Sequence, residues 1–153
     1  MRETPLTYPP DIEQYKTLLR KHSLKATPQR IAVHEAMLGL GHASADEVAE
    51  AIIKQGNVRI TTASVYNILS QMTMLGIYSH RLGIGGKMVF DVTTGMHIHL
   101  YDTVNGTYRD IEDGELMGMV VSRLGKKRFR GYRVDGIDIS ILCHPSNMKK
   151  FRR

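Results

Sequence analysis

The stretch from Thr61 to Gly76 constrains the fold most strongly, because it joins a clear helix signal to an unusual polar face. Thr61 is a favourable N-cap, apolar residues recur at three- and four-residue steps, and Gly76 favours a stop. The opposite face carries short, uncharged, hydrogen-bonding side chains, among them Ser64, Asn67 and Gln71. Such groups can pair with base edges in a DNA major groove, so the stretch predicts a recognition helix. The alternative is an ordinary polar helix packed on its neighbours.

Three further helices are predicted ahead of this one. Thr27 followed by Pro28 is a typical helix start, and Ser44 with Glu47 forms a capping box. Two short helices joined by a tight connection, the second with a polar outer face, indicate a helix-turn-helix. The expected helices cover residues 12 to about 22, 28 to about 39 and 45 to about 55.

After Gly76 the apolar period changes to two, which predicts a β-hairpin with strands at residues 77–82 and 87–92. A hairpin that follows a recognition helix indicates the wing of a winged helix. Lys87, at its glycine-rich tip, can contact a DNA phosphate; a solvated lysine is the alternative.

The rest of the chain predicts a smaller α/β domain. Three strands and one helix bury a poor solitary core, so this domain is expected to pack against a second copy. The fold class is therefore α+β, with an N-terminal winged helix-turn-helix domain (1–92), a hinge (93–96) and a C-terminal α/β dimerisation domain (97–153). Within the dimerisation domain, strands are expected at 97–104, 107–112 and 132–142, a helix at 113–124 and a mobile tail at 144–153.

Composition limits the possible partners. The net charge is +6, which suits an anionic partner. Residues 1–92 hold ten basic and eight acidic residues, so the excess of positive charge is not concentrated on the predicted DNA-binding domain. No apolar run approaches the roughly 20 residues of a membrane span, and no hydrophobic signal region opens the chain, so we expect a cytoplasmic protein with no membrane contact. Cys143 is the only cysteine, which excludes an internal disulfide.

Two histidines and two carboxylates are expected on one face of the hairpin that opens the second domain. His97 and His99 are two residues apart on a predicted strand, so both point to one face. A two-residue turn centred on residues 105–106 would pair His99 with Glu112 and place Asp110 on the same face. Imidazole and carboxylate groups together suit a divalent metal. The alternative is a pH-sensitive patch or a hydrogen-bonded strand pair.

Five segments resemble, in order and spacing, the successive signatures of the ferric uptake regulator family of bacterial metal-responsive repressors. Together they cover roughly residues 15–112, most of the chain. The segments are SLKATPQR at 23–30, HASADEV at 42–48, TTASVYNILSQMTMLGI at 61–77, GGKMVFDV at 85–92 and HIHL at 97–100.

The resemblance implies a DNA-binding winged helix joined to a dimerisation domain, with a regulatory metal held between them. It implies a minor-groove contact at Lys25, a DNA contact at Tyr66 and an adjacent contact at Asn67. The implied metal ligands are His42, Asp91, His97, His99 and Asp110. The expected DNA-contacting set, taken with the residues argued above, is Lys25, Ser64, Tyr66, Asn67, Gln71 and Lys87.

The sequence departs from the family at the structural zinc, which most members hold with two Cys-x-x-Cys pairs. Asp102 and Asn105 stand at the first pair's positions, the second pair falls near Pro145 and Met148, and Cys143 is out of register. No four-cysteine zinc site is therefore expected. Three imidazoles and two carboxylates without sulfur admit Fe(II), Mn(II) or Zn(II) at the regulatory site.

We expect a dimeric, metal-responsive DNA-binding repressor that recognises an AT-rich palindromic operator in double-stranded DNA, and not an enzyme. One alternative is a regulator that is independent of metal or responds to haem or peroxide. Asp110 is typical of the peroxide-sensing branch of the family. Fe(II)-dependent oxidation of His97 or His99 is therefore one form that the peroxide alternative takes. A mononuclear iron enzyme that uses two histidines and a carboxylate is the alternative from another class.

Overall fold

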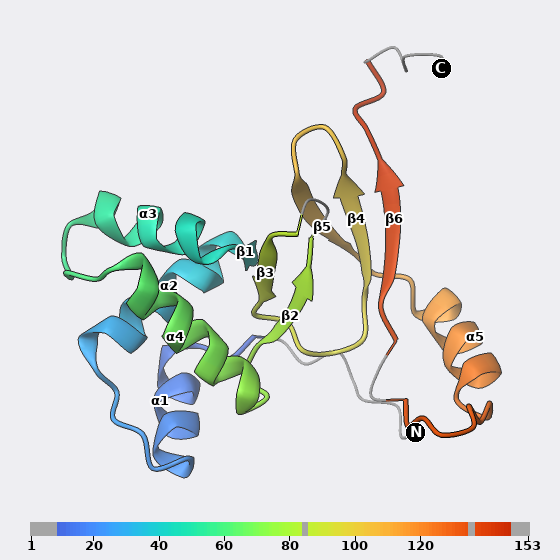
Figure 1. Ribbon diagram of the computed structural model, residues 1–153, viewed down its shortest axis with the longest axis horizontal. Helices are drawn as coiled ribbons and strands as arrows, with labels where there is room; N and C mark the ends of the chain where they lie inside the picture. Colours follow the sequence, from blue (N-terminus) through green and yellow to red (C-terminus); the bar gives the residue numbers. More distant parts are fainter. Residues whose placement is uncertain (1–8, 84–85, 135–136, 148–153) are drawn as a thin grey trace. The chain divides into compact units, whose positions relative to one another are not determined.

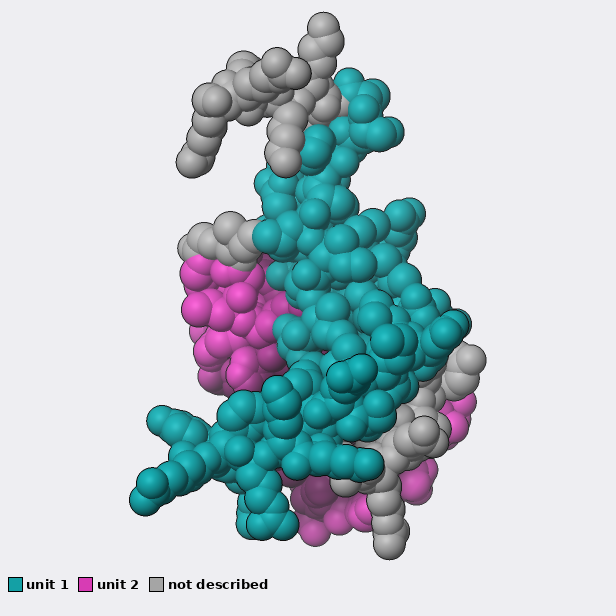
Figure 2. Space-filling view, turned by 90° about the vertical axis from the view of Figure 1, so that its right-hand side faces the viewer, with its two compact units in different colours: residues 1–6, 95–153 teal, residues 7–94 magenta. Residues whose placement is uncertain are grey.

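The computed structural model describes residues 9–83, 86–134 and 137–147. The chain divides into two compact units at residues 94–95, and Figure 2 shows them in different colours. We call the unit of residues 7–94 the N-terminal unit and the unit that holds residues 95–153 the C-terminal unit. None of the helices in the described segments is long and apolar enough to cross a bilayer.

The N-terminal unit is a helix-turn-helix domain followed by a small sheet (Figure 1). The predicted helix starts are confirmed, because the Thr27 and Thr61 hydroxyls each accept a backbone N–H and Ser44 forms its capping box with Glu47. The elements are α1 (Ile12–Lys21), α2 (Pro28–Leu40), β1 (His42–Ala43), α3 (Ala45–Gln55), α4 (Thr62–Met74), β2 (Ser79–Leu82) and β3 (Met88–Asp91).

The sheet has the order β1-β3-β2, and both pairings are antiparallel. The β2–β3 hairpin confirms the predicted wing, with part of its tip outside the described residues. Strand β1 is an addition that the sequence does not predict, because two residues are too short to show a period. It pairs His42 with Asp91 and Ala43 with Phe90.

Helix α4 divides cleanly into a core face and an outer face. Val65, Leu69 and Met72 are fully buried in the core of the N-terminal unit. Ser64 and Asn67, on the other side, are exposed. The core is completed by side chains from every helix and from the wing, including Tyr15, Leu19, Val33, Met37, Val48 and Phe90. The polar face of the predicted recognition helix is therefore left open.

A buried polar group lies inside this core. The His34 ring is fully buried, and Nε2 lies 2.6 Å from the carbonyl oxygen of Pro10, which can only accept, so Nε2 carries the proton. Nδ1 then accepts from the Tyr78 hydroxyl at 2.7 Å. Tyr15 stacks on the His34 ring at 4.0 Å between centroids and donates to the sulfur of Met72. Burial lowers the pKa of His34, so the folded unit holds it neutral.

The C-terminal unit is a three-stranded sheet of order β5-β4-β6 with one helix. Its elements are β4 (Ile98–Asp102), β5 (Thr107–Ile111), α5 (Gly114–Leu124) and β6 (Ile139–Cys143). Strand β4 pairs antiparallel with β5 and parallel with β6. The prediction of a strand from residue 132 is wrong at its start, because β6 is confined to the five residues that pair with β4. Tyr132 instead closes a tight turn with Phe129, and the expected slip at Gly136 lies outside the described residues.

The predicted register of the β4–β5 hairpin is also wrong. His99 pairs with Asp110, not Glu112, because four residues rather than two separate the paired ends, Asp102 and Thr107. The Asp102 carboxylate accepts from the backbone N–H groups of Val104 and Asn105 and from the Asn105 side-chain amide. This aspartate-centred turn accounts for the longer loop. Because the shift is an even number of residues, Asp110 stays on the face of the histidines.

Hydrogen bonds join the ends of β4 and β6 beside this turn. The backbone N–H and the hydroxyl of Thr103 both donate to the Cys143 carbonyl oxygen, at 2.9 and 3.0 Å. The Cys143 thiol donates to the carbonyl oxygen of Tyr101 at 3.4 Å. We refer to these bonds, together with the Asp102-centred turn, as the strand-end clasp. Its turn contains Asp102 and Asn105, the positions where the family resemblance implied the first cysteine pair.

The buried neutral His34 predicts a loss of stability in mild acid. The unfolded chain protonates His34 near pH 6.5 whereas the folded unit resists, so the free energy of unfolding falls as pH drops below 6.5. Replacing His34 by Gln should lower stability at neutral pH and flatten this acid-side slope. Denaturant unfolding across this pH range measures both effects. His22→Gln, at an exposed position, is the matched control and should keep the wild-type slope. An unchanged slope in His34→Gln would contradict the assignment.

Candidate metal centre and nucleic-acid interface

Three potential metal ligands meet on one face of the C-terminal sheet. His97 immediately precedes β4, His99 lies on it, and Asp110 is the β5 partner of His99. The Nε2 atoms of His97 and His99 lie 3.3 and 3.6 Å from the same oxygen, Oδ1 of Asp110. The two rings are 4.1 Å apart between centroids. The hairpin thus gathers the residues that the sequence predicted as neighbours.

The other nitrogen of each ring also has a partner. Nδ1 of His97 donates to the carbonyl oxygen of Gly95 at 2.6 Å. Nδ1 of His99 lies 3.3 Å from the Asp138 carboxylate. Both Nε2 atoms face the Asp110 carboxylate. Two imidazoles with one carboxylate on one face are a donor set that fits a divalent transition metal.

A second pair lies in the N-terminal unit. The β1–β3 pairing sets Nε2 of His42 3.0 Å from Oδ2 of Asp91. The other Asp91 oxygen accepts from the backbone N–H of Thr93 at 2.8 Å, which orients the carboxylate. The structure therefore supplies an imidazole–carboxylate pair in this unit and the His97, His99 and Asp110 group in the other. Each set matches predicted ligands.

Asp138 was missed by the sequence reasoning. It directly precedes β6, and only the parallel pairing of β6 with β4 brings it to His99, from which it is about forty residues distant in the chain. No local pattern marks such a residue. Ser140, not Asp138, is the β6 partner of His99 in the strand register.

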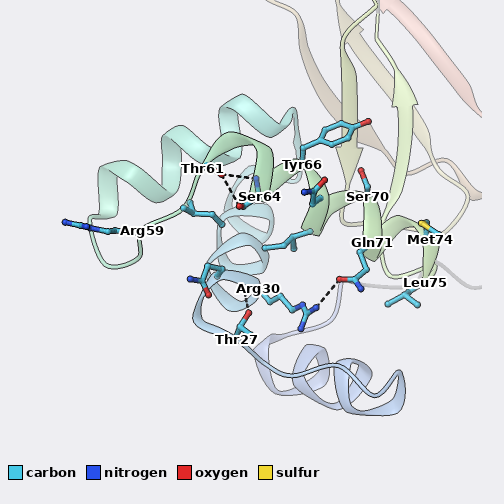
Figure 3. A pocket seen from close by; sticks show the side chains of 14 residues that line it. Thr27, Arg30, Arg59, Thr61, Ser64, Tyr66, Ser70, Gln71, Met74 and Leu75 are labelled. Carbon is cyan, nitrogen blue, oxygen red and sulfur yellow. Dashed lines mark hydrogen bonds between the residues drawn. The ribbon is translucent and has the colours of Figure 1, made fainter.

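A surface hollow of about 1070 Å³ lies over α2, α4 and the segment that leads into α4 (Figure 3). Of the predicted DNA-contacting residues, Ser64, Tyr66, Asn67 and Gln71 all line it. The Tyr66 side chain is 46% exposed while its ring meets Phe90 edge to face at 6.0 Å between centroids. Tyr66 can therefore pack its ring on Phe90 and still present its hydroxyl on the surface.

The other two predicted contacts lie off this hollow. Lys25 is exposed ahead of α2, and Lys87 is exposed just before β3. Arg30 and Arg59 also line the hollow, and neither was singled out from the sequence. Arg30 falls within the quoted segment at 23–30, which was its only signal. These two guanidinium groups give the hollow a positive charge beside uncharged hydrogen-bonding groups, an arrangement suited to nucleic acid.

Comparisons with known proteins agree on one family. The Ferric uptake regulator family profile matches residues 21–135. The ferric uptake regulation protein of Bordetella parapertussis is 35% identical over 101 residues, which is 64% of this chain and 72% of that protein.

Solved structures give the same answer for the fold. The ferric uptake regulator of Vibrio cholerae matches with a TM-score of 0.70 at 24% identity, covering 86% of this chain and 99% of that one. The peroxide stress regulator of Campylobacter jejuni matches with a TM-score of 0.62 at 28% identity, covering 88% and 96%. The fold is thus the two-domain α+β fold of these solved regulators.

The contact between Asp138 and His99 predicts a measurable effect on metal affinity. Replacing Asp138 by Asn removes the charge that orients the His99 ring, and Co(II) should bind about 10-fold more weakly. Titration followed by the Co(II) absorption spectrum measures this. Glu115→Gln, an exposed carboxylate on α5, is the matched control and should bind as the wild type does. Equal Co(II) affinity in Asp138→Asn and wild type would contradict the assigned role.

Proposed function

This chain belongs to the ferric uptake regulator family of metal-responsive transcription regulators, and we propose that it is a dimeric repressor whose operator binding is switched by one divalent ion. The observation that carries this proposal is the convergence of the His97 and His99 imidazoles on the Asp110 carboxylate, a donor set that suits a divalent metal. The proposed ligands are His42, Asp91, His97, His99 and Asp110. Fe(II), Mn(II) and Zn(II) all suit this donor set, and no four-cysteine zinc is involved.

The two ligand sets lie on different units, and this is the basis of the proposed switch. Only five residues separate Asp91 from His97, so the chain keeps their Cα atoms within about 20 Å of each other whatever the orientation of the units. An ion that takes ligands from both sets favours one orientation over the rest. In a dimer, that orientation sets the spacing of two recognition helices, which must match two half-sites on the duplex.

For DNA contact we propose the outer face of α4. Ser64, Asn67 and Gln71 offer hydrogen bonds to base edges without a charge, and the Tyr66 hydroxyl extends the same face. Lys25 and Lys87 supply contacts to the minor groove and to phosphate. The partner is an AT-rich palindromic operator, and the protein acts in the cytoplasm, where bacterial DNA lies. Regulators of this family bind DNA and are not enzymes, and we propose the same here.

The C-terminal unit supports the proposed homodimer. Helix α5 has no buried residue, and its apolar side chains Leu116 and Met119 are 38% and 56% exposed. On β6, Leu142 is 63% exposed. Such a surface is unfavourable in water and is suited to a second copy of the same domain.

The metal switch is tested by comparing DNA affinity with Mn(II) and with chelator. Duplexes enriched from a random-sequence pool should bind the wild type about 5- to 150-fold more tightly with Mn(II), the range of typical coupling energies. Replacing His97 and His99 together by Ala should abolish this gain, because the converging donors are lost. His22→Ala is the matched histidine control. Equal affinity of the wild type with Mn(II) and with chelator would reject the switch and favour a metal-independent regulator.

Peroxide sensing is a second candidate, favoured by Asp110 and by the 28% identity to a peroxide stress regulator. In this case hydrogen peroxide transfers one oxygen atom to the ring of His97 or His99 and leaves as water. Fe(II)-loaded protein exposed to peroxide should gain the mass of one oxygen on the peptide that holds both histidines, and should release DNA. Mn(II)-loaded protein is the control and should stay unmodified. An unmodified Fe(II) sample would reject this candidate.

A further inference from the structure

Arg30 bridges two of the proposed DNA-contacting segments. From its place in α2, it donates through Nη1 to the carbonyl oxygen of Lys25 at 2.8 Å. Through Nη2 it donates to Oε1 of Gln71, on α4, at 3.2 Å (Figure 3). The planar guanidinium thus holds the segment ahead of α2 and the recognition helix in one geometry.

This contact decides which half of the Gln71 amide faces outward. An amide oxygen and nitrogen are easily interchanged when a side chain is placed, but a guanidinium has only donors. The atom that meets Arg30 must therefore be Oε1. The NH₂ group is then the half of the Gln71 side chain that remains for a base.

A glutamine normally recognises adenine with both halves of its amide. Oε1 accepts from the adenine amino group while the NH₂ donates to N7. With Oε1 engaged by Arg30, the bidentate adenine contact is lost, and the NH₂ can make only a single hydrogen bond, to adenine N7. Guanine instead presents two acceptors, O6 and N7, side by side in the major groove.

We propose that Arg30 acts as a positioning residue that makes Gln71 a donor-only reader, selective for a guanine edge. The inference rests on the proposed DNA-binding function and deepens it. Each half-site of an otherwise AT-rich operator then contains one G·C pair at the position that Gln71 contacts. Arg30 itself touches no base in this arrangement and acts through the orientation of the amide.

The test selects duplexes from a random-sequence pool with the full-length protein and Mn(II). In duplexes selected with Gln71→Ala, base preference should disappear at one base pair. That base pair is the position that Gln71 contacts. The wild type should show G·C there, with about tenfold discrimination against A·T. Arg30→Ala frees Oε1 and should shift that one position toward A·T while the other positions keep their preferences.

Two further variants test whether Arg30 acts by orienting the Gln71 amide, by its positive charge, or by contacting a base itself. Arg30→Lys keeps the positive charge but loses the fork that reaches both acceptors, so it should shift the same position. In the Gln71→Ala background, Arg30→Ala should change no base preference, because Arg30 acts only through Gln71. A change there would mean that Arg30 reads a base directly, and would overturn the inference.

The remaining outcomes separate this inference from the function on which it rests. A wild-type preference for A·T at the Gln71 position, with other positions still selected, overturns the role of Arg30 and leaves the DNA-binding function standing. Failure of the wild type to enrich any sequence, with Mn(II) or with chelator, overturns both. Each variant should unfold thermally close to the wild-type curve. This control shows that the differences in base preference do not come from a loss of folding.

Discussion

The convergence of two imidazoles on one carboxylate is the constraint on which the C-terminal unit depends. The Nε2 atoms of His97 and His99 both face Oδ1 of Asp110, while their Nδ1 atoms lie against the Gly95 carbonyl oxygen and the Asp138 carboxylate. Imidazole and carboxylate donors gathered in this way suit a divalent metal. The β4–β5 hairpin and the neighbouring β6 strand hold the groups in place. The donor arrangement is therefore built into the strand pairing.

The N-terminal unit solves a different problem, which is to keep a polar helix face open and rigid. The apolar side of α4 contributes three fully buried residues to the core, so the helix cannot rotate without exposing them. Behind it, the His34 ring joins the Pro10 carbonyl, at the entry to α1, to the Tyr78 hydroxyl, at the start of the wing. Every polar atom of that ring has a partner, which is what a buried polar group needs to stabilise a single arrangement.

Local features of the fold could be predicted from the sequence, and long-range pairings could not. Helix caps depend on residues three apart, so Thr27, Ser44 and Thr61 were placed correctly. The register of the β4–β5 hairpin was misjudged because an aspartate-centred turn lengthened the loop. Strand β1 and the contact between Asp138 and His99 depend on pairings between distant segments, for which a single sequence carries no signal. The same holds for the bond from Arg30 to Gln71, which spans two helices.

The strand-end clasp has a consequence for how this protein tolerates its surroundings. Where four thiolates fasten a sheet through zinc, oxidation or a strong chelator can dismantle the scaffold itself. Here the same corner is held by a carboxylate, a hydroxyl and backbone groups, and its lone thiol is only a weak donor. At this corner neither thiol oxidation nor a chelator has a zinc–thiolate bond to break.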